Sequence, residues 1–121
     1  MQKKSTLTPA PVVSYSALVG KLLVQRREQI GLKQGELAAA LGMSQSAYSR
    51  LESGESVLNI SQLRRVCALL HTSSAEVLQE ADAYEARLVS EGVEVITEKP
   101  LNQAAIAIGL GLLAALLLSS K

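Results

Sequence analysis

Two short segments with helical apolar spacing meet at Gly42, and this arrangement limits what the chain can fold into. Leu37, Ala38 and Leu41 recur at positions that share one face of a helix. Gly42 can take a positive φ at a helix end because it has no Cβ. Ser44 stands where its hydroxyl can accept from the free amides of a following helix. The pattern therefore predicts two short helices joined by a tight turn.

The second of these helices has an apolar side and a polar side. Ala47, Tyr48 and Leu51 are expected to face inward. Amide, hydroxyl and guanidinium groups are the ones that read base edges in the major groove of DNA. The outward side chains carry those groups and no acid, and they are Gln45, Ser46, Ser49 and Arg50.

The stretch LKQGELAAALGMSQSAYSRLESG, residues 32–54, resembles the helix-turn-helix of the Xre/Cro/CI-type phage and bacterial repressors. The resemblance covers roughly residues 18–78 and implies an all-α, five-helix, lambda-repressor-like DNA-binding domain. It is specific because many positions agree at once: Gln34, Leu37, Ala38, Leu41, Gly42, Ser44, Gln45, Arg50, Leu51, Glu52 and Gly54.

The resemblance also implies roles for five polar residues. Gln45, Ser46 and Arg50 match the positions that contact bases. Gln34, at the start of the first of the two helices, and Ser49 match positions that contact the phosphate backbone. We therefore expect one helix face to read DNA while its neighbours hold the backbone.

The resemblance further implies an ion pair between Arg27 and Glu52 that holds the first helix against the recognition helix. Its expected role is structural. Two positions depart from the family pattern. Gly35 replaces a residue with better helix propensity, at a cost of up to about 1 kcal/mol. Glu55 follows the recognition helix where DNA-binding relatives often carry a cation, and it would repel a phosphate.

Three more helices are expected around the helix-turn-helix. The first covers residues 15–30, Asn59 caps the fourth, and Ser73 or Ser74 caps a fifth that runs to about Glu91. Helical spacing predicts their buried sides. These are Tyr15, Leu18, Val19, Leu22, Leu23 and Ile30 in the first, Ile60, Leu63, Val66, Cys67 and Leu70 in the fourth, and Val77, Leu78, Ala81, Tyr84 and Leu88 in the fifth.

The chain is expected to divide into four parts. Residues 1–14 form a flexible N-terminal arm, residues 15–91 the helix-turn-helix domain with its acidic last helix, and residues 92–99 a linker. The linker contains VEVIT, which alternates like a strand but is too short to stand alone. Residues 100–120 form a separate hydrophobic segment.

Charge is distributed unevenly along the sequence. Residues 1–71 contain nine Lys or Arg and four Glu, a net charge of +5, while residues 72–121 have a net charge of −4. A basic part that carries a helix-turn-helix is typical of a module that binds phosphates. The single cysteine, Cys67, excludes an internal disulfide and is expected to be a buried filler in a reducing compartment.

Residues 100–120 contain no ionisable side chain and lie between Lys99 and Lys121. As a helix these 21 residues would be about 31 Å long, close to the thickness of the hydrocarbon core of a bilayer. Apolar residues occupy every side, which a small domain cannot bury. We predict a transmembrane helix, with a buried helix of the domain or of an oligomer as the alternative.

These observations predict a sequence-specific transcriptional regulator of the Xre type, a repressor that binds double-stranded DNA as a homodimer. A single-pass C-terminal anchor would hold it on the cytoplasmic side of the bacterial inner membrane. The alternative is a membrane-tethered adaptor that uses the helix-turn-helix fold to bind protein, as cytoskeletal adaptors do. We expect no enzyme, cofactor or metal site, because no nucleophile–base pair, metal cluster or phosphate loop is present in the sequence.

Overall fold

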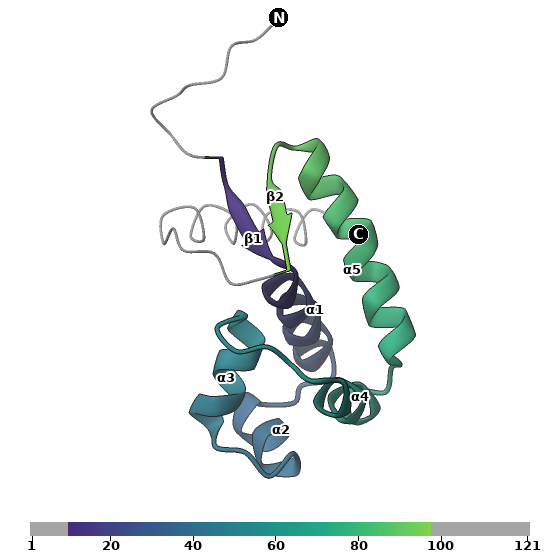
Figure 1. Cartoon of the computed structure of the whole chain (residues 1–121). Helices are drawn as coiled ribbons and strands as arrows, with labels where there is room; N and C mark the ends of the chain where they lie inside the picture. The colour runs from purple at the N-terminus through teal and green to yellow at the C-terminus, as the bar shows by residue number, and fades with distance from the viewer. Residues whose placement is uncertain (1–9, 98–121) are drawn as a thin grey trace, which may run out of the picture.

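The computed structural model describes residues 10–97 of the chain. Within this range it contains five α-helices and two short strands (Figure 1). The predicted five-helix, lambda-repressor-like domain is therefore confirmed, and a small sheet is added to it. In chain order the elements are β1 (Val12–Ser14), α1 (Tyr15–Gln29), α2 (Gln34–Ala40), α3 (Gln45–Ser53), α4 (Ile60–Leu69), α5 (Ser74–Ser90) and β2 (Glu94–Ile96).

Side-chain caps begin four of the five helices, and three of these caps, at Ser44, Asn59 and Ser73, stand at positions that the sequence predicted. A capping oxygen satisfies a backbone N–H that has no partner inside the helix. In each case the oxygen accepts from the amide three residues later: Ser14 from Ala17 (3.0 Å), Ser44 from Ala47 (3.1 Å), Asn59 from Gln62 (2.7 Å) and Ser73 from Glu76 (3.1 Å).

Helix α1 runs through the middle of the domain and packs against both α3 and α5 (Figure 1). Its Leu18 and Leu22 are fully buried, as are Leu37 of α2, Val66 of α4 and Leu88 of α5. The core thus contains one face of every helix, so α3 rests on a rigid support.

Two residues predicted to be buried are exposed. Ile30 is 47% exposed and Ile60 is 77% exposed. Ile30 is the C-cap of α1, and the chain turns away directly after it at Gly31. Ile60 is the first residue of α4, at the outer end of that helix. Helical spacing predicts which side of a helix is apolar, but it does not show where the neighbouring helix stops.

The two ends of the described chain pair as a parallel two-stranded sheet. Val12 lies opposite Glu94, Val13 opposite Val95 and Ser14 opposite Ile96. This corrects the expectation of a flexible arm as far as Ser14 and of a linker from residue 92. The pairing is possible because Val13 and Val93 are buried in the core, at 1% and 2% exposure, which holds two otherwise marginal strands together.

The predicted hydrophobic segment 100–120 lies outside the described residues. Within residues 10–97, no helix is both long enough and apolar enough to cross a bilayer.

The strands lie near the N-terminal end of α1, whereas α2 lies near its C-terminal end (Figure 1).

Candidate nucleic-acid interface

Helices α2 and α3 form the predicted helix-turn-helix. Gly42 has a φ of 71°, and the amide of Met43 donates to the carbonyl oxygen of Ala38 at 2.9 Å. This left-handed residue closes α2 and lets the chain turn into α3 within a few residues. Leu37 of α2 and Leu51 of α3 are both buried in the core, and the two helices pack against each other.

The outward face of α3 carries the side chains that the sequence assigned to DNA. Gln45, Ser46 and Arg50 are exposed, and Ser49 is partly exposed at the side of the same helix. Among the described residues, the Arg50 guanidinium forms no ion pair. This face is therefore free to meet a partner and contributes little to the core.

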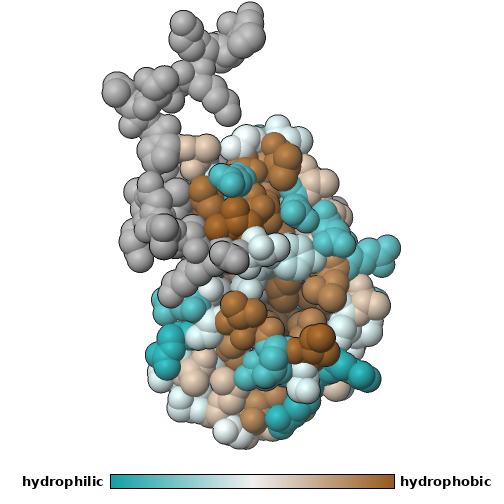
Figure 2. Space-filling view, in the orientation of Figure 1, coloured by the Kyte–Doolittle hydropathy of each residue, from teal (hydrophilic) through white to brown (hydrophobic). Residues whose placement is uncertain are grey.

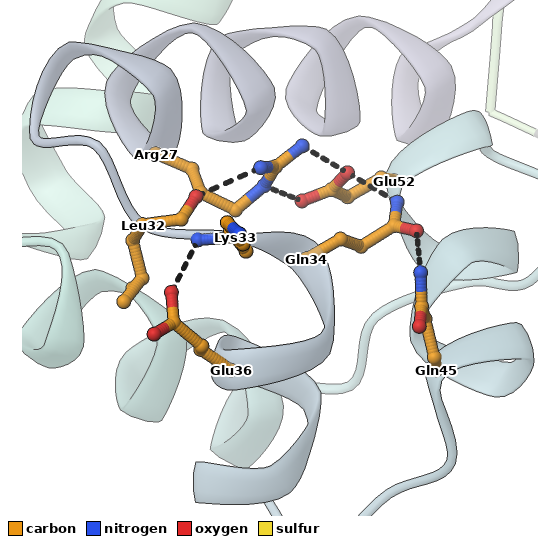
Figure 3. Close-up of polar contacts among 7 residues, drawn as sticks. All are labelled: Arg27, Leu32, Lys33, Gln34, Glu36, Gln45 and Glu52. Carbon is orange, nitrogen blue, oxygen red and sulfur yellow. Dashed lines mark hydrogen bonds and ion pairs between the residues drawn. The ribbon is translucent and has the colours of Figure 1, made fainter.

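Arg27 and Glu52 form a nearly buried ion pair between α1 and α3. Arg27 Nε and Nη2 donate to the two oxygens of Glu52 at 2.8 and 3.2 Å (Figure 3). Arg27 Nη1 also donates to the carbonyl oxygen of Leu32, at 2.9 Å. The hydrogen bond to Glu52 raises the pKa of Arg27. The side chains of Arg27 and Glu52 are only 11% and 4% exposed, so water screens the pair weakly.

Gln34, the first residue of α2, adds that helix to the contact. Its amide nitrogen donates to Glu52 Oε1 at 2.8 Å, and its amide oxygen accepts from Gln45 Nε2 at 3.4 Å (Figure 3). We expected the Gln34 amide to donate to a phosphate. One of its two N–H groups is used by Glu52, which leaves the second for that role. The contact with Gln45 gave no signal in the sequence, because it joins two different helices.

Two small residues of α1 allow α3 to come unusually close. A Cβ on Gly20 would clash with the carbonyl oxygen of Glu52. At the end of α3, Gly54 has a φ of 84°, and a Cβ there would lie 2.6 Å from Ala17. Sequence reasoning missed this contact, although Ala17 and Gly20 are small residues at i and i+3 within a helix of larger apolar side chains.

Part of the acidic surface of α5 is used inside the domain. Arg26 pairs with Glu80 at 3.0 Å, and the Tyr15 hydroxyl donates to Asp82 at 2.6 Å. Burial, helped by that hydrogen bond, raises the pKa of Tyr15. Glu55, by contrast, is exposed just after α3. The acid that could oppose a phosphate is therefore Glu55 rather than the face of α5 that packs on α1.

The remaining candidates for a reactive or metal-binding site among the described residues are acidic clusters and Cys67. No group of three His, Cys, Asp or Glu side chains within residues 10–97 could hold a metal ion. Cys67 is 1% exposed, as expected for a filler, and burial raises the pKa of its thiol.

Comparison with known proteins agrees with this geometry. The profile of a helix-turn-helix family matches residues 23–77. A crystal structure of the clp gene regulator ClgR from Corynebacterium glutamicum is 31% identical, with a TM-score of 0.61 over 69% of this chain and 86% of that chain. A second ClgR structure is 33% identical, with a TM-score of 0.55 over 58% of this chain and 91% of that chain.

An XRE-family like protein from Pseudomonas syringae pv. tomato str. DC3000 is 34% identical, with a TM-score of 0.51 over 58% of this chain and 84% of that chain. The search of curated proteins found no match. The family profile lies within the five-helix part of the chain.

Proposed function

Because this chain belongs to the Xre/Cro/CI-type helix-turn-helix family, we propose that it is a sequence-specific DNA-binding transcriptional regulator that acts as a repressor. One observation carries the proposal. The exposed face of α3 is polar and free of acids, and the opposite face is locked to α1 by the Arg27–Glu52 pair. A rigid helix with such a face suits insertion into a major groove.

In this proposal Gln45, Ser46 and Arg50 contact bases. A glutamine can bond adenine through N6 and N7, and an arginine can bond guanine through O6 and N7, each worth about 1–3 kcal/mol of discrimination. The contact from Gln45 to Gln34 uses one of its N–H groups and leaves its oxygen and second N–H for a base. Gln45 can therefore form hydrogen bonds with a base while it keeps its hydrogen bond to Gln34.

Gln34 and Ser49 would hold the phosphate backbone on either side of this contact. Gln34 is fixed by Glu52, so its second amide hydrogen has a set direction. Ser49 lies at the side of α3, where a hydroxyl can donate to a phosphate oxygen. Such contacts position the helix without reading the sequence.

The protein would read a two-fold site as a homodimer, and residues 100–120 would anchor it in the membrane. The support for dimerisation is the half-site geometry usual for helix-turn-helix proteins. The support for the anchor is the run of 15 apolar or Gly residues from 104 to 118. The DNA-binding domain would then lie on the cytoplasmic side.

The second candidate is a membrane-tethered adaptor that binds protein through the same fold. Exposed Glu55 at the end of α3 favours it, because a carboxylate there would face the phosphates of a bound duplex. The acid-free face of α3 favours DNA. A DNA-binding regulator should select a specific sequence from a random DNA pool, whereas an adaptor that binds only protein should not.

The test is selection of bound DNA from a random pool by the full-length protein in mild detergent. We expect a two-fold motif to be enriched. Arg50→Ala should relax preference at one base pair and weaken the specific site by about 1–3 kcal/mol. Arg64→Ala is the matched control, because Arg64 is also an exposed arginine but lies on α4. A pool that stays random would favour the adaptor.

A further inference from the structure

An apolar groove lies on the side of α1 near the loop between α3 and α4. It has a volume of about 190 Å³. Since a cavity of roughly 150 Å³ holds one benzene molecule, this groove can take one or two aliphatic side chains. Its walls come from α1, the loop, α4 and α5, through Tyr15, Val19, Val57, Leu58, Leu63 and Leu78.

Two large apolar side chains, one in the wall of the groove and one close to it in the sequence, are exposed. Val57 in the wall is 68% exposed, and Ile60, three residues further on, is 77% exposed. Figure 2 shows hydrophobic side chains gathered around a hollow in the lower half of this face, over the region where α1, α4 and the loop before α4 meet in Figure 1. Large exposed apolar groups that adjoin an apolar groove mark a surface that is covered by a partner.

The path of the chain after β2 indicates which segment covers the groove. The last residue of β2, Ile96, pairs with Ser14, and the next residue after Ser14 is Tyr15, which lines the groove. The chain therefore leaves the described structure, after Thr97, beside the groove. Residues 98–103 can span up to roughly 20 Å when extended. The apolar run 104–118 thus begins within reach of this surface.

We propose that this groove is the docking site for the chain's own apolar segment, residues 104–118, when no bilayer is present. Leucine and isoleucine side chains of that segment fill the groove and cover Val57 and Ile60. The tether makes the contact intramolecular, so it forms at an effective concentration in the millimolar range. The inference goes beyond the proposed anchor, because it states where the segment goes before it meets a membrane.

The test is disulfide trapping in the full-length chain, made in a cell-free system without lipid or detergent. A Val57→Cys, Leu113→Cys variant places one thiol on the groove and one in the apolar segment. Ile30→Cys with Leu113→Cys is the control, because Ile30 is an exposed apolar residue at the other end of α1. Cys67 stays in place, since it is buried. Non-reducing electrophoresis separates intrachain from interchain disulfides.

The proposal predicts an intrachain disulfide that forms at least about tenfold faster with Val57→Cys than with Ile30→Cys. Adding Ile60→Asn to the Val57→Cys, Leu113→Cys variant should remove most of its rate advantage, and adding Ile30→Asn to the same variant should leave its rate unchanged. Equal rates at the two positions would overturn the proposal. Disulfides only between chains would also overturn it, because a second copy would then be the occupant.

Discussion

Gly20 of α1 packs directly on the backbone of Glu52 in α3, with no room for a Cβ between them. This contact lets Arg27, two turns further along α1, reach both oxygens of the Glu52 carboxylate with its Nε and Nη2. The position of the recognition helix therefore depends on a residue that carries no side chain.

Gly20→Ala should destabilise the protein strongly. The added methyl group meets backbone rather than a movable side chain, so the cost should be at least about 3 kcal/mol in the free energy of unfolding. Urea denaturation followed by circular dichroism measures it. Gly35→Ala is the control. Its Cβ would lie 3.3 Å from the movable Gln45 Oε1, so the gain in helix propensity of up to about 1 kcal/mol should dominate.

Breaking the Arg27–Glu52 pair should cost far more than breaking a surface pair. Arg27→Ala removes the cation that pairs with the nearly buried Glu52 carboxylate and leaves it the neutral amide of Gln34 as a donor, so we expect a loss of about 3 kcal/mol in the free energy of unfolding. Arg26→Ala, which breaks the more exposed pair with Glu80, should cost about 0–1 kcal/mol. Equal losses in the two variants would show that the Arg27–Glu52 pair does not hold α1 to α3.

Tyr48→Phe should stabilise the protein near neutral pH. The Tyr48 side chain is fully buried, and its hydroxyl lies near the Glu52 carboxylate without a hydrogen bond of good geometry to a described residue. Because an unpaired buried donor costs about 1–3 kcal/mol, its removal should raise the free energy of unfolding by about 1 kcal/mol. Thermal melting at neutral pH measures the change. A melting temperature that falls would show that the hydroxyl has a partner in solution.

The same residue should make stability depend on alkaline pH. Burial, with the nearby Glu52 carboxylate, raises the pKa of Tyr48, so the folded state keeps its proton when the unfolded chain, with a tyrosine pKa of about 10, has lost it. The stability that Tyr48 contributes by keeping its proton is complete below pH of about 10 and declines above it. Tyr48→Phe should flatten that decline. Because the pKa of Tyr15 is also raised, part of the alkaline decline in stability should remain in the Tyr48→Phe variant.

The full-length protein should sediment with membranes and resist extraction by high salt. Peripheral binding through the basic part of the chain would be lost in salt, because it depends on screened charge. Leu113→Arg should release much of the protein, since a charge in the middle of the proposed span would oppose insertion by about 2.5–3.5 kcal/mol. Leu113→Ile should remain bound. A wild-type protein that stays in the supernatant when membranes are present would exclude the anchor.

The sequence alone determined the features that arise within a few residues. Helix starts at Ser44, Asn59 and Ser73 could be predicted because a cap acts on an amide three residues away. The turn at Gly42 could be predicted because a positive φ favours glycine. The polar face of α3 follows from helical spacing, and residues 32–54 together were specific enough to indicate the family.

Only the tertiary structure decided the contacts between distant segments. The pairing of Val13 with Val95 and the contact of Gln34 with Gln45 join elements whose local sequences contain no sign of each other. The exposure of Ile60 likewise depends on where neighbouring helices end. Local spacing and caps act along one element, whereas register, close approach and burial are set by which surfaces meet when the whole core packs.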